Sequence, residues 1–535
     1  MVNWRFINTY LKNFFIIGGI FISMVLFGSC KGYNFKEVES PNKKYNIILF
    51  LVDDLGWQDT SLSLGLSEDL LPVKYINTPN LTKLAERGVM FSNAYSTPVC
   101  SPSRISLLTG MNAARHKVTN WTLYPNQIQP MEQNHPILEF PFWNVNGLAT
   151  SDSIPNAINA TPLPEVLSKN GYRTMHFGKA HFGALGYPSS DPINLGFEIN
   201  VGGHAAGAPG SYLGIDSFRS LPHENEDVFA VPDLEDYFGQ DIFLTTALTN
   251  EALKKLEEGN RDRPFFLYMS YYGVHIPITP DNRFVEKYLE KGMDSIEANY
   301  ASMVESVDSS IGSILSYLES TNQMEETIVL FMSDNGGLSA LSRGGDSHTH
   351  NLPLNSGKGS IYEGGIRVPM VVYHPDYKVE KRTIHTPIII EDFFPSILDF
   401  AGIIKTDLKQ KVDGISFKPL MDDFASPELD SRSLFWHYPN DWGPEGPGIG
   451  AFSAVRNGNW KLIYYHDSMD FELFNLSEDI GEIKNLFKLY PSIAIRLSQL
   501  MSDHLRDSDA QMPVFKSNRE TVPFPDEMVK SKLFE

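Results

Sequence analysis

The sequence predicts an α/β fold: a large mixed, mostly parallel β-sheet flanked by helices, followed by a small C-terminal α+β part with an antiparallel sheet. Several apolar runs are nearly continuous, which indicates strands covered on both faces. Amphipathic helix patterns alternate with these runs, as in α/β proteins. Such folds bind ligands beyond the carboxyl ends of their strands. Residues that follow the predicted strands are therefore the first candidates for a functional site.

The N-terminal segment is typical of an export signal. Arg5 and Lys12 precede an apolar stretch, and Cys30 follows two small residues. This order resembles a bacterial lipoprotein signal. It predicts removal of residues 1–29, lipidation of Cys30, a tether over residues 30–44, and an exported lipoprotein on the periplasmic or cell-surface side of the outer membrane. A signal peptide without lipidation and an uncleaved anchor are the alternatives.

Four apolar segments predict the strands of the large sheet, and helix patterns lie between them. The predicted strands are residues 46–52, 172–177, 264–270 and 327–332. The predicted helices are residues 81–87, 241–258 and 295–319. We expect one catalytic domain over residues 45–404.

Polar side chains follow each of these four strands. They are Asp53 and Asp54 after the first, Lys179 and His181 after the second, His275 after the third, and Asp334 and Asn335 after the fourth. A single such ending is equally consistent with a capped turn. Because parallel strands end at one edge of a sheet, the four together predict one shared site.

The pattern changes in the C-terminal residues 405–535. Short runs with strand character occur at residues 433–437, 451–456, 460–466 and 471–476, and a helical pattern follows at residues 492–505. Asn457-Gly458 between two such runs predicts a hairpin. We therefore expect a small antiparallel sheet with one helix as a separate C-terminal subdomain.

Charge and cysteine content exclude several classes of protein. The chain of 535 residues carries 44 basic and 65 acidic side chains, a formal net charge of -21. This balance argues against a surface that binds nucleic acid, which relies on clustered Lys and Arg. An anionic substrate would need a local cationic site. The 2 cysteines cannot form a disulfide scaffold.

The second cysteine lies in a distinctive context. The segment Cys100-Ser101-Pro102-Ser103-Arg104 precedes an apolar helical run, and proline suits the first turn of a helix. Cys100 would then lie at a helix N-terminus, which favours anions, and Arg104 would add a fixed charge. A free cysteine without this context is more often a small buried apolar side chain.

This segment resembles the signature of the type I sulfatases of the alkaline phosphatase-like superfamily, in which a maturase converts the cysteine to formylglycine. The resemblance covers residues 45–486. Further motifs match in order: residues 46–56, Gly178-Lys179-Ala180-His181, Val274-His275-Ile276-Pro277, residues 333–337, Gly357-Lys358-Gly359 and residues 362–369. Ala180 stands where the family often has Trp. The resemblance implies a sulfuric ester hydrolase.

The resemblance also implies the roles of individual residues. The metal ligands would be Asp53, Asp54, Asp334, Asn335 and the modified Cys100; oxygen ligands suit Ca²⁺, with Mg²⁺ as the alternative. The catalytic residues would be Cys100, Arg104, Lys179, His181, His275 and Lys358. In these roles, Asp334 takes the proton of the nucleophile, His275 protonates the leaving alcohol, and His181 helps to release sulfate.

The substrate is less visible in the sequence. Candidates for a substrate wall are His204, Arg343, His348, His350 and His437, with Tyr212, Trp436 and Trp442. Aromatic residues of the insertion at residues 117–156, such as Trp121, are expected to pack the loop rather than to stack on sugars. Export and the signature together favour a carbohydrate O-sulfate over an aryl sulfate, and so degradation of sulfated glycans.

Two other functions remain open. The first is a phosphate or phosphonate ester hydrolase of the same superfamily, which a Ser or Thr nucleophile and ligands for a second metal would indicate. The second is a non-catalytic, surface glycan-binding lipoprotein with an unmodified Cys100.

Overall fold

The computed structural model describes residues 43–535 apart from residues 65–75, 132–134, 223–225, 260, 378–381, 405 and 423–424. The predicted signal at residues 1–29, Cys30 and most of the tether lie outside the described residues. No helix within the described part of the chain is both long enough and apolar enough to cross a membrane.

A nine-stranded sheet forms the centre of the structure. Its order is β11 (Arg382–Ile384), β2 (Val89–Tyr95), β10 (Arg367–Tyr373), β9 (Thr327–Ser333), β1 (Asn46–Val52), β8 (Phe265–Tyr271), β6 (Arg173–Gly178) and β7 (Ile199–Val201), with β12 (Ile388–Ile389) also paired to β2. β1 is parallel to both β8 and β9. β10 runs antiparallel to β9 and β2. The predicted mixed, mostly parallel sheet is confirmed.

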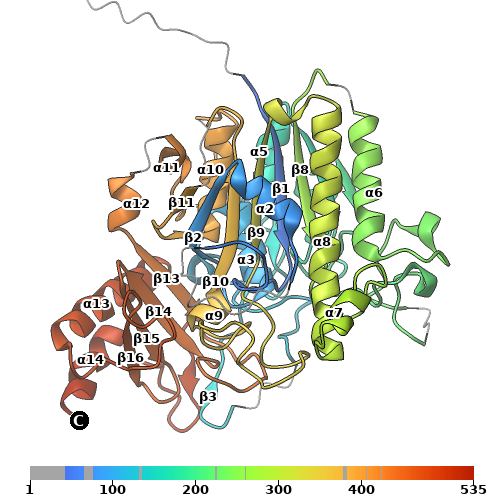
Figure 1. Ribbon diagram of the computed structural model, residues 1–535. Helices are drawn as coiled ribbons and strands as arrows, with labels where there is room; N and C mark the ends of the chain where they lie inside the picture. The colour runs from blue at the N-terminus through green and yellow to red at the C-terminus, as the bar shows by residue number, and fades with distance from the viewer. Residues whose placement is uncertain are drawn as a thin grey trace, which may run out of the picture. The chain divides into compact units, whose positions relative to one another are not determined.

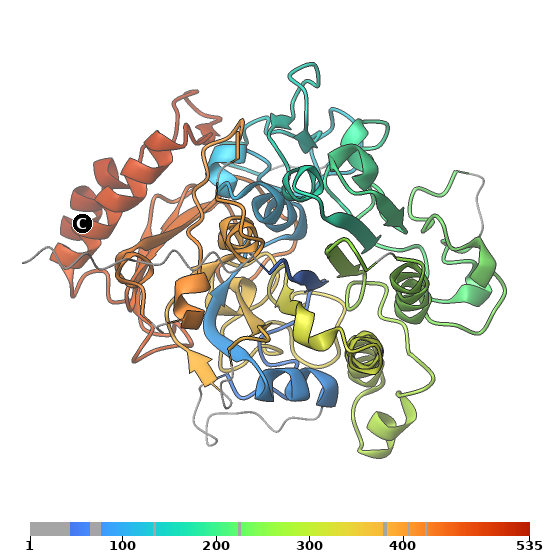
Figure 2. The same cartoon turned by 90° about the horizontal axis from the view of Figure 1, so that it is seen from above.

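Helices cover both faces of this sheet, which explains the continuous apolar runs (Figure 2). Ile47, Leu49 and Leu51 point to a core shared with α3 (Cys100–Thr109), α5 (Leu163–Lys169) and α10 (Phe393–Phe400). The alternate residues of β1 point to a second core shared with α2 (Pro79–Glu86), α6 (Leu244–Glu257) and α8 (Ser295–Ser320). Side chains of a strand alternate between the faces of its sheet, so β1 is buried on both.

The small sheet is antiparallel throughout. It consists of β13 (Ser433–Tyr438), β14 (Phe452–Asn457), β15 (Trp460–Tyr465) and β16 (Phe471–Asn475). Asn457 pairs with Trp460, so the predicted hairpin is present. Helix α13 (Pro491–Asp507) was expected, whereas α14 (Pro525–Phe534) was not; both share a core with the sheet (Figure 1).

The other face of the small sheet packs against segments that lead into the candidate site. Its buried residues Trp436 and Phe452 share a cluster with Val99 and Ile361. The Trp436 indole also donates a hydrogen bond of 2.8 Å to the Ser96 carbonyl. The C-terminal sheet therefore packs against the segment that precedes Cys100 and the segment that follows Lys358.

The remaining described elements are short. They include α4 (Ala113–His116), β3 (Leu138–Glu139), β4 (Leu148–Ala149), β5 (Ile158–Asn159), α7 (Glu286–Glu290), α9 (Glu363–Ile366), α11 (Lys418–Asp422), α12 (Pro427–Ser431) and β17 (Val514–Phe515). Phe417, Leu420 and Leu429 belong to the core of the large sheet. Residues just beyond position 405 therefore pack with the preceding part of the chain.

Candidate active site

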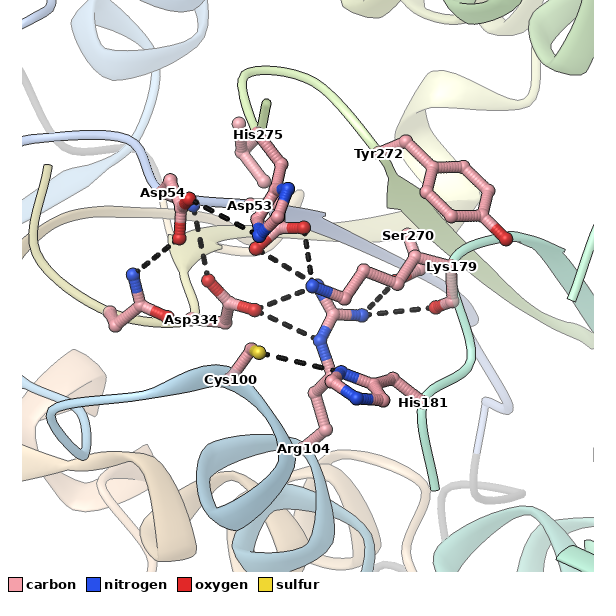
Figure 3. A network of polar contacts seen from close by, with 12 residues as sticks. Asp53, Asp54, Cys100, Arg104, Lys179, His181, Ser270, Tyr272, His275 and Asp334 are labelled. Atoms are coloured by element: carbon pink, nitrogen blue, oxygen red, sulfur yellow. Dashed lines mark hydrogen bonds and ion pairs between the residues drawn. The ribbon is translucent and has the colours of Figure 1, made fainter. Parts of the chain in front are cut away.

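The ends of β1 and β9 bring four oxygen-bearing side chains together (Figure 3). Parallel pairing places Val52 opposite Ser333, so the residues that follow both strands meet. Asp53, Asp54, Asp334 and Asn335 all have 0% exposure. The Asp54 amide donates to Asp334 Oδ1 at 3.2 Å, and Asn335 Nδ2 donates to Asp54 Oδ1 at 2.7 Å. The shared site predicted from the strand ends is thus formed by the fold.

Three cations are interleaved with these carboxylates. Lys179 Nζ lies 2.5 Å from Asp53 Oδ2, and Lys358 Nζ lies 2.6 Å from Asp54 Oδ1. Arg104 donates from Nε to Asp334 Oδ2 at 2.9 Å. Its Nη2 lies 2.8 Å from the same oxygen. The cluster thereby gives each carboxylate at least one cationic partner in a protein of net charge -21.

Arg104 connects three strand ends. Besides Asp334, its Nη1 donates to the Lys179 carbonyl at 3.0 Å and to Ser270 Oγ at 2.6 Å. The guanidinium is fully buried. Its hydrogen bonds hold the ends of β6, β8 and β9 together. Both oxygens of Asp334 already accept hydrogen bonds from Arg104 and Asp54. Its predicted roles as a metal ligand and proton acceptor must compete with these bonds.

Burial and charge shift the acid–base properties of the two aspartates in opposite directions. Burial and the Asp334 carboxylate raise the pKa of Asp53 well above its usual range, although Lys179 opposes this. Burial alone would also raise the pKa of Asp54, but Lys358, His275 and Lys179 outweigh it and lower that pKa. The Asp54 carboxylate in turn raises the pKa of Lys358 in spite of its burial. Asp54 and Lys358 are therefore a charged pair.

Cys100 is the first residue of α3, as the sequence predicts. Val99 before it is extended, and the whole helix is buried. The Cys100 Sγ lies 3.4 Å from His181 Nδ1, and His181 Nε2 lies 2.8 Å from the Thr122 carbonyl. A carbonyl can only accept, so Nε2 carries the proton and neutral His181 presents a lone pair to residue 100. Burial and the charges of Lys179 and Arg104 lower the pKa of His181, which keeps it neutral.

His275 faces the carboxylates from the loop after β8. Its Nε2 lies 3.7 Å from Asp54 Oδ2, while Nδ1 lies 3.0 Å from the Ile276 carbonyl. Burial and Lys358 lower the pKa of His275 to about 3. The Tyr212 hydroxyl, 2.7 Å from the Tyr272 carbonyl and 2.8 Å from that of His275, holds the loop in place.

The site fits a hard divalent cation. Asp53 Oδ1, Asp54 Oδ2 and Asn335 Oδ1 are buried oxygens without a hydrogen-bond partner in the described structure. Ligand atoms of Asp53, Asp54 and His275 lie within 4.8 Å of one another. Buried oxygens of this kind are costly unless a partner satisfies them. Carboxylate and amide oxygens are the ligands that Ca²⁺ and Mg²⁺ prefer.

A cavity of about 280 Å³ opens above Cys100. The site residues Cys100, His181, His275 and Lys358 line the part of it that we call its base. Trp121 from the insertion and Trp442 from the C-terminal part line its walls. Trp121, expected to pack its loop, therefore faces the cavity.

The other substrate candidates do not line this cavity. Arg343 is held by Asp59 at 3.0 Å and Glu297 at 2.6 Å and stacks on Tyr300. The four histidines have other partners. His437 hydrogen-bonds with Ser453 and Gln511, His350 with Ser339 and Gly344, and His348 with Ser356. The ring of His204 packs near that of Tyr272. Trp436 is buried between the two sheets.

Some functional residues were not visible in the sequence. Ser270 binds Arg104, and Thr122 fixes the tautomer of His181 through its carbonyl. Tyr212, expected as part of a substrate wall, instead holds the His275 loop. Ser270 is the last residue of a predicted strand, and this position could have marked it as a site residue. Thr122 acts through its backbone carbonyl, so its residue type gives no indication of this role.

A family model described as Sulfatase matches residues 45–403, and one described as N-sulphoglucosamine sulphohydrolase, C-terminal, matches residues 357–509. The chain therefore belongs to the sulfatase family. With this family and the named sulfatases among its relatives, it is a sulfuric ester hydrolase.

Curated relatives and solved structures agree with this assignment. A sulfatase of Formosa agariphila is 28% identical, covering 95% of this chain and 96% of its own. The N-acetylgalactosamine-6-sulfatase of Mus musculus is 29% identical, covering 82% of this chain and 76% of its own. The structure of Ps i-CgsB with k-i-k-neocarrahexaose has a TM-score of 0.68 at 25% identity, covering 87% of this chain and 93% of that one.

Proposed function

We propose that this protein hydrolyses an O-sulfate ester on a carbohydrate, using a formylglycine made from Cys100 by a maturase and a Ca²⁺ ion, or less favourably Mg²⁺. The ion would be held by the formylglycine and by Asp53, Asp54, Asp334 and Asn335. One observation carries the proposal: residue 100 lies at the base of a cavity beside a neutral His181 and a cluster of buried cations and carboxylates. A carbohydrate substrate is supported by the relatives named N-acetylgalactosamine-6-sulfatase and by the structure of Ps i-CgsB in complex with k-i-k-neocarrahexaose.

Residue 100, as a hydrated aldehyde, would carry two hydroxyl groups. Asp334 takes the proton of one of them, the oxygen of that hydroxyl attacks sulfur, and the bond from sulfur to the alcohol oxygen breaks. His275 gives the alcohol its proton; it is neutral in the free site, and the negative charge of bound sulfate would raise its pKa and favour the protonated form. Lys358 and Lys179 balance the negative charge on the sulfate oxygens. A bound divalent cation would supply a Lewis acid that polarises sulfate and favours the deprotonated hydroxyl.

The second hydroxyl regenerates the enzyme. His181 Nδ1 accepts its proton, the aldehyde C=O re-forms, and the carbon–oxygen bond to sulfate breaks. Sulfate leaves, and one water molecule hydrates the aldehyde again. The lone pair that His181 directs at residue 100 supports this role.

We further propose that the enzyme is exported as a lipoprotein through Cys30, on the periplasmic or cell-surface side of the outer membrane, and degrades sulfated glycans there. The basic and apolar N-terminal pattern supports this localisation. Labelling with a lipid precursor in cells, compared with the Cys30→Ala variant, tests it.

A phosphonate ester hydrolase is the main alternative, because this fold also occurs in the phosphonate monoester hydrolase of Agrobacterium radiobacter, with a TM-score of 0.56 at 17% identity. The test is release of sulfate from a panel of sulfated mono- and disaccharides, with matched phosphate and phosphonate esters. We expect sulfate release that the Cys100→Ala variant abolishes. Turnover of only the phosphorus esters would overturn the proposal, and binding without turnover would indicate a glycan-binding lipoprotein.

A further inference from the structure

The walls of the cavity differ sharply from its base. Residues that can carry charge lie at the base, where Lys358, His181 and His275 surround Cys100. Above them the walls include Trp121, Leu123, Phe229, Ile276, Leu341 and Trp442. Among the described lining residues, none of the wall positions is Lys, Arg, Asp or Glu.

The cations at the base already have partners in the site carboxylates and, in the proposed reaction, in the sulfate that reacts. Lys358 is paired with Asp54 at 2.6 Å, and its side chain is 6% exposed. Lys179 and Arg104 are fully buried beneath the cavity. A second anionic group on the substrate would therefore face apolar walls without a counterion. Removing such a group from water without a partner is strongly unfavourable.

The aromatic part of the wall is fixed close to the reacting group. A Cβ atom on Gly359 would lie 2.0 Å from the Trp442 ring, so the indole rests directly on the backbone next to Lys358. The Gly359 amide also donates to the Pro98 carbonyl at 2.8 Å, near Cys100. An indole held there offers a flat apolar surface beside the reacting group, where we expect the ring that bears the sulfate to lie.

The size of the cavity limits what enters it. At about 280 Å³, it lies just below the range of about 300–1,000 Å³ of pockets for drug-sized ligands. One sugar ring with its sulfate is of suitable size, and further units of a chain would lie outside.

We propose that these walls select a sulfate ester whose sugar ring carries no second negative charge: a neutral, singly sulfated residue, in preference to rings that bear an additional sulfate or carboxylate. This inference rests on the proposed function and names the substrate class of the same site. The acidic net charge of -21 acts in the same direction, because it disfavours polyanions.

The test compares paired substrates. The best singly sulfated sugar from the panel is assayed beside derivatives of the same sugar that carry one extra sulfate or a C6 carboxylate. We expect kcat/KM to fall about 10-fold or more for the doubly charged compounds, a factor that corresponds to about 1.4 kcal/mol. Equal values would overturn the inference and leave the proposed function standing, whereas no release of sulfate from any sugar would overturn both.

A variant with a positive charge added to the wall tests whether the wall causes the discrimination between the paired substrates. Leu341 is 61% exposed and lines the cavity, so Leu341→Lys places a counterion there without removing a core side chain. We expect it to reduce the discrimination between the paired substrates several-fold. Leu352→Lys is the matched control, because Leu352 is 51% exposed and does not line the cavity. The same change in both variants, or no change in Leu341→Lys, would overturn the assignment.

Discussion

Lys461 lies outside the cavity, and replacing it with Met should destabilise the protein. Lys461 Nζ lies 3.0 Å from Glu363 Oε1 and 2.8 Å from Glu482 Oε1, and all three side chains are 0% exposed. This cluster joins the small sheet to α9, which follows the loop of Lys358. Methionine fills a similar volume but leaves two buried carboxylates without their shared cation.

The expected loss follows from the partners that remain. Removing one member of a buried ion pair costs about 3–5 kcal/mol. Glu363 keeps the Tyr95 hydroxyl at 2.7 Å and Arg367 at 3.4 Å. We therefore expect the lower end of that range, about 3 kcal/mol. Guanidinium denaturation of both proteins measures it, with Lys169→Met as a matched control in an exposed pair that should leave the midpoint unchanged.

The loss of stability in the Lys461→Met variant should depend on pH in a defined direction. Burial raises the pKa of Glu482 to about 7 even with Lys461 present. Without the lysine, the native carboxyls bind protons more readily than in the unfolded chain, so the variant gains stability as pH falls below the native pKa. The deficit should shrink between about pH 8 and pH 5. An unchanged midpoint at pH 8, or a deficit that grows toward pH 5, would refute the reasoning.

Two further predictions concern the site itself. Lys358→Ala should lower kcat for a sulfate ester by about 10²–10³, the usual effect of losing one group that stabilises transition-state charge; steady-state sulfate release checks this, and near-normal kcat would remove Lys358 from the catalytic set. Removal of divalent cations with a chelator should lower the thermal midpoint of the native protein, because buried oxygens lose their partner, and Ca²⁺ should restore it. Asp54→Asn should abolish that Ca²⁺-dependent shift, and an equal shift in the variant would place the cation elsewhere.

The sequence predicted the site better than the substrate wall, for physical reasons. Asp53 and Asp334 directly follow buried strands, and such strands appear as unbroken apolar runs whose ends share one edge. β10 was not predicted as a strand because Pro369 interrupts it. The structure places that proline where the pairing with β2 shifts register, between Val368 and Met370, as expected for a residue without an amide hydrogen.

Arg343 and His437 show why proximity in sequence did not identify substrate contacts. Arg343 follows the motif of Asp334, yet it lies against Tyr300 and two acids. His437 is enclosed by Ser453 and Gln511. Trp121 and Trp442 come from segments far apart in the chain, and their shared cavity depends on how the small sheet packs against the large one.

The central claim is that the reacting group is an aldehyde made from Cys100. Mass spectrometry of the tryptic peptide of residues 88–104, from catalytically active protein made in a host with a maturase, measures it directly. We expect the mass of formylglycine at residue 100, in a fraction that parallels the specific activity. Active protein in which residue 100 is entirely the unmodified thiol would contradict the account.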